Sequence, residues 1–316
     1  EEIHNRLDEI EEIHALYSPT ILGLAAALAC CAFTFLLGGG LVEMVLAFIA
    51  AGIGNLVRTK LIKHHYTLFL NISMSISAAC LAYALCLKLA EVLFHLPAFH
   101  EAGYICSILF IIPGFPFITS GIDLAKLDLR SGLERLTYAI IIILVATMFA
   151  WIMALLLDLQ PLTFTSMSLN PILLLCLRII ASFCGVFGFS IMFNSTIPMA
   201  AIAALIGAVA NTFRLELIDF TGMPPAAAAF IGALSAGLLA SEIKKNNGYP
   251  RISLTVPSIV IMVPGLYLYR AIYNFGIMSL TEAVSWFTSA IMIIIMLPLG
   301  LIFARILTDR AFRFCT

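Results

Sequence analysis

The chain has 316 residues, of which 62% are hydrophobic and only 11% are charged, and its mean hydropathy is +1.08. Soluble domains carry roughly 45–50% apolar and about 25% charged residues, so this composition predicts an integral membrane protein whose surroundings are the lipid bilayer. The formal net charge of −1 and the lack of a basic–aromatic pattern argue against nucleic acid as a partner.

Residues 1–19 form the first predicted element, an acidic amphipathic helix. Ile3, Leu7, Ile10 and Ile13 recur at spacings of four, three and three, which places them on one stripe of such a helix. The stripe is narrow and its surroundings are acidic, so tight binding to an anionic lipid surface is not expected. We predict that this helix packs on the cytoplasmic face of the bundle.

The rest of the chain divides into ten apolar spans, each long enough to cross roughly 30 Å of hydrocarbon at about 1.5 Å per residue. The spans are 20–37, 41–57, 67–87, 102–122, 136–157, 171–192, 196–213, 224–240, 253–273 and 284–304. We therefore predict an all-α polytopic membrane protein. Its parts are the helix at 1–19, a five-helix unit at 20–157, and a second five-helix unit at 158–316 that ends in a cytoplasmic tail.

Positive charge is distributed unevenly between the two sides of this topology. The loops 58–66, 123–135 and 241–252, together with the two chain ends, hold 13 of the 17 lysines and arginines. The other side holds Lys88, Arg178, Arg214 and Arg270. Because cytoplasmic loops carry the excess of positive charge, we predict that both termini are cytoplasmic.

The two halves of the chain repeat each other. Three pairs of marks recur, the first two at an offset of 156 and the third at 151: Gly38 with Asn194, Asn55 with Asn211, and Pro113-Gly114 with Pro264-Gly265. Since each copy has five spans, an odd number, the second copy enters the membrane the opposite way round. Such inverted repeats are typical of secondary transporters, with the site near mid-membrane between the copies, although a channel could share the symmetry.

The fourth span is interrupted by Pro113, Gly114 and Pro116. Proline inside a helix costs about 3 kcal/mol, and in lipid the freed backbone groups need partners, so such a break usually marks a site. The new half-helix should present free amides to an anionic group. Thr119, Ser120 and Asp123 follow within two turns and are expected to line the cavity. The alternative is a kink that only serves helix packing.

The ninth span repeats the break at Pro264-Gly265, followed by Tyr269, Arg270 and Asn274. Asn274 aligns with Asp123 at the offset of 151. The planar guanidinium of Arg270 could hold a carboxylate. Equally, Arg270 lies near the outer end of its span, and its side chain could simply extend to the interface.

Other polar residues complete the candidate substrate site. Asn71 and Ser75 are one turn apart and could face the site, although serines in membrane helices usually serve helix packing. Asn194, in the turn between the sixth and seventh spans, is a further candidate. Asp123 is the preferred proton-coupling group. Glu43 is the second candidate, and we expect it to be a solvated carboxylate near the outer surface.

Enzyme and metal signatures are missing from the sequence. There is no nucleotide-binding glycine loop, HExxH, GxSxG or calcium-loop pattern, so we predict neither an enzyme nor ATP-driven pumping. The eight cysteines form no CxxC pair, and all except Cys315 lie in apolar runs, so we read them as small buried hydrophobes. No metal or cofactor is predicted, which leaves an ion gradient as the coupling force.

Three stretches together resemble the threonine/serine exporter family. They are PGFPFITSGIDLAKLDLRSGLERL at 113–136, the GGG turn with its apolar span at 38–57, and the second PG followed by LYLYRAIYNFG. The resemblance implies a fused two-module exporter of threonine and serine in the bacterial inner membrane, coupled to the proton gradient. Split-chain relatives are associated with succinate export, so a dicarboxylate is the alternative. The oligomeric state stays open, and a homo-oligomer is one arrangement that the sequence allows.

Overall fold

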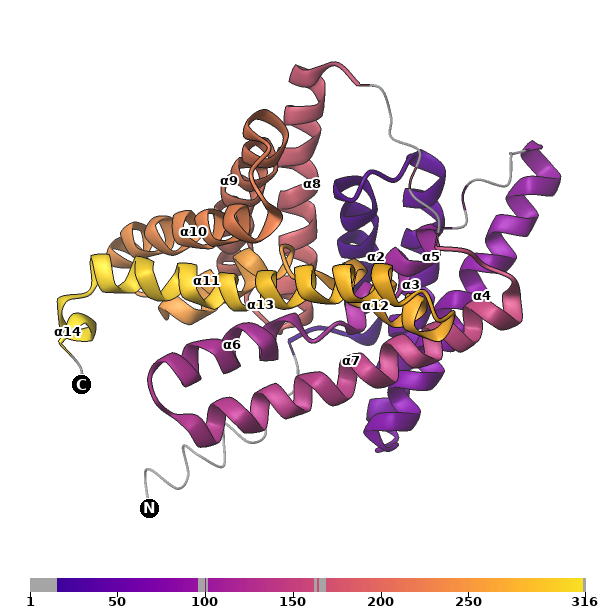
Figure 1. The fold of residues 1–316 in the computed structure, drawn as a ribbon, viewed down its shortest axis with the longest axis horizontal. Coiled ribbons are helices and arrows are strands. Elements are labelled where there is room, and N and C mark those ends of the chain that lie inside the picture. Colours follow the sequence, from indigo (N-terminus) through magenta and orange to yellow (C-terminus); the bar gives the residue numbers. More distant parts are fainter. Residues whose placement is uncertain (1–15, 96–99, 101, 162–163, 165–168, 315–316) are drawn as a thin grey trace.

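The computed structural model describes residues 16–95, 100, 102–161, 164 and 169–314, and every regular element in these ranges is helical (Figure 1). The all-α prediction is therefore confirmed. Of the acidic helix predicted at 1–19, residues 1–15 lie outside the described part of the chain. Cys315 also lies outside it.

The helices divide evenly between the two halves of the chain. The first half contains α2 (Pro19–Leu36), α3 (Leu41–Lys63), α4 (Leu68–Phe94), α5 (Gly103–Ser107), the 3-10 turn η2 (Leu109–Ile111), α6 (Gly114–Ala125) and α7 (Leu129–Leu157). The second half contains α8 (Pro171–Met192), α9 (Ile197–Thr221), α10 (Pro225–Asn247), α11 (Arg251–Val260), α12 (Gly265–Gly276), α13 (Leu280–Thr308) and α14 (Arg310–Arg313).

The long apolar helices fit a multi-pass membrane protein. Among the described residues, eight helices are long and apolar enough to cross a membrane, and two bent pairs bring the number of spans to as many as ten. The first pair, Gly103–Ile111 with Gly114–Ala125, is bent by 55°, and the second, Arg251–Val260 with Gly265–Gly276, by 48°. Both breaks fall where the Pro-Gly pairs predict them.

Several helices extend beyond their predicted spans, because hydrophobicity sets the length in lipid while capping decides where a helix ends. α7 begins at Leu129 instead of 136, where the Asp128 side chain accepts a hydrogen bond from the Ser131 amide. α9 continues to Thr221 and ends at Gly222, whose φ of +66° is left-handed. The charged and polar turns at the ends of these helices are therefore helical, although they lie outside the apolar stretches from which the spans are predicted.

The turns at Gly38 and Asn194 end their helices in the same way. Both residues are left-handed, with φ of +95° and +61°. In the first turn the Gly39 amide donates to the Thr34 carbonyl, and in the second the Ser195 amide donates to the Ser190 carbonyl, at 2.8 and 3.1 Å. These six-residue closures are Schellman motifs, in which glycine and asparagine are the residues that best tolerate the left-handed position.

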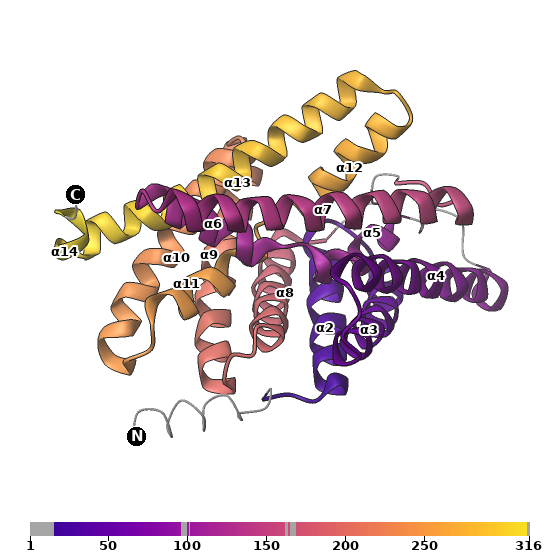
Figure 2. The same cartoon turned by 90° about the horizontal axis from the view of Figure 1, so that it is seen from below.

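The halves meet where α2 packs against α8, and contacts within one half have counterparts in the other. α2 packs on α3 as α8 packs on α9, α4 on α7 as α10 on α13, and α6 on α7 as α12 on α13. Figure 2 shows α6 lying beside α7 along one side of the bundle. The α2–α8 contact is close, because a Cβ added at Gly188 would lie 2.5 Å from the Ala25 carbonyl oxygen.

The cysteines follow the prediction only in part, because Cys31, Cys86 and Cys184 are half-buried. Those in the described residues are free thiols, and Cys30, Cys80 and Cys106 are buried. The prediction is wrong for Cys176, which is exposed on α8. A residue on the outward side of a membrane helix faces an apolar medium anyway, so sequence hydrophobicity does not distinguish it from a buried one. No group of histidines, cysteines and carboxylates in the described part of the chain has metal-site geometry.

We predict that Gly188→Ala destabilises the fold and that Gly52→Ala does not. The added methyl group at Gly188 meets backbone, whereas the one at Gly52 meets the Ala27 side chain at an ordinary 3.4 Å. Overpacking of this kind costs about 1–3 kcal/mol, so the thermal midpoint of the detergent-purified Gly188→Ala variant should fall. An unchanged midpoint for this variant would contradict the packing of α2 on α8.

Candidate functional site

Both Pro-Gly breaks are inverse γ-turns centred on the proline. Pro113 has φ −79° and ψ 57°, and the Gly114 amide donates to the Ile112 carbonyl at 2.8 Å. Pro264 has φ −83° and ψ 54°, and the Gly265 amide donates to the Val263 carbonyl at 2.9 Å. The ring of proline presets a φ that suits this turn. The chain therefore changes direction while keeping part of its backbone hydrogen bonding within the break.

The half-helices after the breaks offer fewer free amides than the sequence suggests. In α6 the Gly114 amide is used by the turn, Pro116 has no N–H, and the Phe117 amide donates to the Pro113 carbonyl at 3.1 Å. The Phe115 amide is what remains of the first turn. In α12 the Leu268 amide donates to the Pro264 carbonyl in the same way.

The two breaks lie against each other. A Cβ added at Gly265 would lie 2.9 Å from Leu109, and one added at Gly114 would lie 3.2 Å from Val263. Between them is a cavity of about 10 Å³, lined by Phe33, Leu109, Ile112, Gly114, Phe189, Val260, Val263 and Gly265. That volume is roughly what one water molecule needs. The centre of the molecule is therefore apolar and closed in this conformation.

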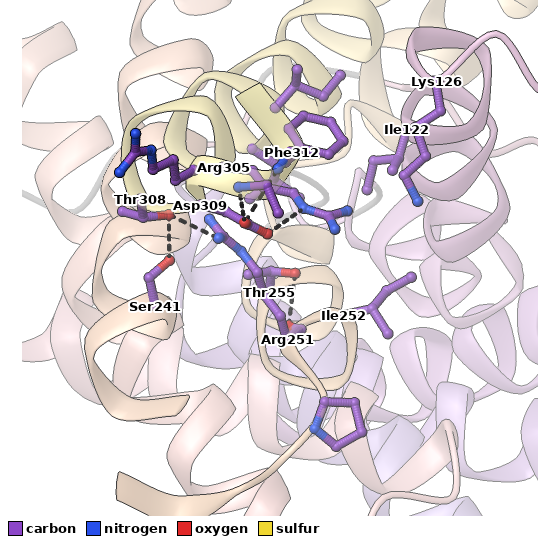
Figure 3. A pocket seen from close by; sticks show the side chains of 15 residues that line it. Ile122, Lys126, Ser241, Arg251, Ile252, Thr255, Arg305, Thr308, Asp309 and Phe312 are labelled. Atoms are coloured by element: carbon purple, nitrogen blue, oxygen red, sulfur yellow. Dashed lines mark hydrogen bonds and ion pairs between the residues drawn. The ribbon is translucent and has the colours of Figure 1, made fainter. Parts of the chain in front are cut away.

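A large cavity of about 810 Å³ opens at the end of the molecule where α6, α11 and α13 meet the C-terminal α14 (Figure 3). We call it the basic vestibule. It is lined by Ile122, Lys126, Ser241, Pro250, Arg251, Ile252, Thr255, Leu301, Ile302, Arg305, Thr308, Asp309, Arg310, Ala311 and Phe312. Its walls reach Ile122 and Thr255, each about two turns from a break.

Arg251 is the best-anchored cation of the vestibule. Its Nη1 donates to the Thr308 hydroxyl at 2.9 Å (Figure 3). Its Nη2 donates to the Gly237 carbonyl at 3.1 Å. The Thr308 hydroxyl also lies 3.2 Å from that of Ser241. The guanidinium is thereby held between α10, α11 and α13, so a bound anion would meet a prepositioned charge.

The vestibule has four cationic side chains and one carboxylate, Asp309. Hydrogen bonds from the Phe312 backbone amide, together with the Arg305 guanidinium, lower the pKa of Asp309, so this carboxylate stays ionised at neutral pH. The other charged residues that line the cavity are Lys126, Arg251 and Arg310. The balance of charge favours an anionic group.

The opposite end of the broken spans is closed by Tyr104 of α5 and Tyr269 of α12, which we call the tyrosine plug. Their hydroxyls share a hydrogen bond of 2.6 Å, and their rings meet edge to face with centroids 5.8 Å apart. Both side chains are fully buried. At the offset of 151 their counterparts are the smaller Thr255 and Ile118, so the two ends are filled unequally.

The hydroxyls predicted to line the site are bonded to their own helix. Thr119 donates to the Phe115 carbonyl at 3.0 Å, and Ser120 to the Phe117 carbonyl at 2.9 Å. Asp123 forms an ion pair of 2.9 Å with Arg135, which ties the end of α6 to α7. Asp123 lies next to the vestibule residue Ile122 along the chain, yet it does not line the vestibule.

The residues predicted after the second break lie on the side of the plug. The Arg270 guanidinium stacks over Trp286 with its centre 4.9 Å from the ring centroid. Asn274 donates to the Arg270 carbonyl at 2.8 Å. Tyr269 belongs to the plug itself. Arg270 is half-buried against aromatic side chains and does not simply extend to the surface.

The remaining predicted residues lie apart from the breaks. Ser75 donates to the Asn71 carbonyl at 2.6 Å within α4. Asn194 is exposed in its turn, where its side chain accepts a hydrogen bond from the Leu16 amide at 3.0 Å. The structure does not bring these three residues together with Pro113 or Pro264.

The expectation of a solvated Glu43 is wrong. Its side chain is only 1% exposed, and its Oε1 lies 2.8 Å from Nδ1 of His100. The partner is 57 residues further along the chain. No local pattern links these two residues, because they lie far apart in the sequence.

The sequence also gives little sign of the vestibule. From the sequence, Arg251 and Arg305 are expected only to help set the orientation in the membrane. Thr255 and Thr308 are not predicted to belong to a site. The sequence shows only that these four residues lie near the ends of predicted spans on the predicted cytoplasmic side. Only the packing of α10 against α11 and α13 shows that these ends meet around one cavity.

The closed centre between paired broken helices, the vestibule at one end and the plug at the other define a polytopic membrane transport protein. Two family models match the chain, one described as "Putative threonine/serine exporter" over residues 1–157 and the other as "Threonine/Serine exporter, ThrE" over residues 178–307. The chain belongs to the threonine/serine exporter family. Members of this family are transporters and not enzymes.

Two curated relatives match part of the chain. Each is named "Probable succinate transporter subunit YjjP", one from Escherichia coli strain K12 and one from Klebsiella aerogenes, and each is 28% identical over 156 residues. The match covers 48% of this chain and 57% of each relative, so the chain spans little more than half of their length. No solved structure matches the chain.

We predict that the vestibule is open to water. Ile252 lines it and is 44% exposed, whereas Ile259, two turns further along the same helix, is fully buried. Because thiol reactivity depends on access and on the thiolate form, Ile252→Cys should react at least about tenfold faster than Ile259→Cys with a hydrophilic maleimide. Rates are measured above the background of the unsubstituted protein. Equal rates would contradict an open vestibule.

Proposed function

We propose that this protein exports small hydroxy amino acids, threonine and serine, by alternating access between two inverted five-helix repeats, with proton antiport as the driving force. The observation that carries this proposal is the unequal filling of the two ends around a closed centre. One end holds the basic vestibule and the other holds the tyrosine plug. A transporter caught open to one side has this arrangement.

The topology of the proposal is supported by the lining of the vestibule. Lys126, Arg251 and Arg310 come from three segments that the charge distribution assigns to the cytoplasmic side. If the three segments lie on the same side of the membrane, these residues can line one cavity, as they do here. We therefore propose that the vestibule faces the cytoplasm of a bacterial inner membrane, with both termini on that side.

The inverted repeat is supported by three kinds of correspondence. The Schellman turns at Gly38 and Asn194, the γ-turns at Pro113 and Pro264, and the helix contacts of one half all recur in the other. In such transporters the substrate site lies between the repeats. We propose that the γ-turn residues, with Thr119 and Ser120 after the first break, border that site once the centre opens.

The cavity volumes favour a carrier over a channel. A pore would need a continuous path, but the space between the breaks holds about one water molecule. Substrate would enter the vestibule, meet Arg251 with its carboxylate, and pass the breaks only after the helices rearrange. The ammonium group of the substrate would then meet carbonyls freed by the breaks.

A dicarboxylate such as succinate is the second candidate substrate. Four cationic side chains against one carboxylate suit a doubly negative ion better than a zwitterion. The name of the curated relatives points the same way for those proteins. That name also describes a subunit, and we propose an oligomer, either of this chain alone or with a second chain.

Proton coupling needs a group that binds and releases a proton, and Asp123 and Glu43 are the candidates. Asp123 has a permanently charged partner, Arg135, at the vestibule end of α6. Glu43, in the first turn of α3, is buried against His100, which precedes α5 at the end of the broken span opposite to α6. No cofactor enters the proposal.

We predict that Arg251→Gln lowers the rate of substrate exchange at least about tenfold, since removing one partner of a charge-assisted bond costs roughly 1.5–3 kcal/mol. The assay is counterflow of labelled threonine, serine and succinate in proteoliposomes. Arg251→Lys, which keeps the charge, should retain part of the activity. Arg130→Gln is the matched control, because the Arg130 side chain is 91% exposed and forms a surface ion pair with Glu134.

The outcomes separate the candidates. Exchange of threonine and serine supports the first, and exchange of succinate alone supports the second. Lack of exchange for all three in the unsubstituted protein would contradict both. Equal loss in the Arg251→Gln and Arg130→Gln variants would remove the vestibule from the transport path.

A further inference from the structure

The buried pair of Glu43 and His100 has no role in the substrate path described above. Glu43 uses one carboxylate oxygen, Oε1, in its 2.8 Å contact with His100 Nδ1. Its other oxygen, Oε2, is buried and has no hydrogen-bond partner among the described residues. Burying an ionisable side chain in a membrane protein costs free energy, and such residues are usually functional. A buried carboxylate with one oxygen lacking a hydrogen-bond partner therefore suggests a function.

The pair lies at the start of the half-helix that carries the plug. Glu43 is in the first turn of α3, and a Cβ added at Gly103 of α5 would lie 3.0 Å from it. The His100 carbonyl accepts a hydrogen bond of 2.6 Å from the Tyr83 hydroxyl. His100 is therefore fixed through both its side chain and its backbone, and Tyr104 follows four residues later.

The other titratable groups around the pair come from four helices. Tyr83 of α4 and Cys106 of α5 face it directly, and Cys106 in turn interacts with Arg270 of α12 and Cys30 of α2. None of these four groups is a carboxylate. Glu43 is the acidic group of this cluster, and His100 is its partner that can gain a proton.

We propose that Glu43 and His100 form a proton-binding site that controls the opening of the tyrosine plug, an inference that rests on the proposed transport function. With neutral His100, Nδ1–H donates to the carboxylate and the pair carries one negative charge. A second proton binds to Nε2, which keeps this hydrogen bond and makes the pair neutral overall. A neutral ion pair is cheaper to bury than an unbalanced charge.

Protonation therefore favours the closed plug, and loss of the proton favours an arrangement in which water reaches Glu43. This effect of protonation fits antiport if the pair takes its proton from the outside after the substrate has left. The plug then closes, and the proton is released to the cytoplasm before the plug opens again. The second half of the chain lacks such a pair. At the offsets of 156 and 151 the equivalents of Glu43 and His100 are Met199 and Arg251, and neither releases a proton at neutral pH.

The test compares three variants in proteoliposomes. Glu43→Gln keeps the shape of the side chain but cannot carry the charge. Glu282→Gln is the matched control, because Glu282 also lies in the first turn of a helix but is exposed. Asp123→Asn tests the other candidate. Each protein is assayed for counterflow at equal pH and for net transport driven by a pH gradient.

Glu43→Gln should keep counterflow and lose the dependence on the gradient, which for one coupled proton is about tenfold in accumulation per pH unit. Glu282→Gln and Asp123→Asn should keep that dependence. Retained dependence in Glu43→Gln would overturn the inference, and its loss in Asp123→Asn alone would assign coupling to Asp123. Lack of counterflow in the unsubstituted protein would instead overturn the proposed function.

A second measurement does not depend on transport. Cys106 is buried behind the plug, and its labelling by a hydrophilic thiol reagent, detected by mass spectrometry, reports opening. Labelling should rise with pH more steeply in the unsubstituted protein than in Glu43→Gln or His100→Gln. Equal pH profiles in all three proteins would contradict control by the pair. His100→Gln serves if Glu43→Gln does not fold.

Discussion

The need to satisfy backbone polar groups inside an apolar medium governs this structure. A helix interrupted in lipid exposes donors and acceptors that water cannot reach, and each unsatisfied group costs free energy. Here both interruptions are inverse γ-turns in which proline removes one donor and the following glycine amide bonds two residues back. The two turns then lie against each other, so protein and not lipid surrounds the interrupted segments.

Glycine at both turns permits this close approach. A side chain at Gly114 or Gly265 would enter the space of the opposite half-helix, so the repeated Pro-Gly pair serves both the turn and the contact between halves. The result is a tight apolar centre between two ends of different character. One end is wide and basic, and the other is filled by two hydrogen-bonded tyrosines. At the offset of 151, the two tyrosines correspond to the smaller Thr255 and Ile118.

Several polar side chains predicted to belong to the site instead form hydrogen bonds or ion pairs with nearby protein groups. Thr119 and Ser120 bond to carbonyls of their own helix, Asp123 pairs with Arg135, and Asn194 anchors Leu16. Such local bonds are the usual fate of short polar side chains in helices, because the nearest acceptor is the carbonyl three or four residues back. The charges that stand around a large cavity are instead those at helix ends.

The sequence by itself determined the class of protein, the spans and the position of both breaks. Apolar length and proline act locally, so composition and spacing are enough to predict them. The sequence could not determine that Glu43 is covered by His100, that Arg251 is held by Thr308 and Gly237, or that one end is open while the other is closed. These features join residues far apart in the chain, and only the packing of the helices decides which of them meet.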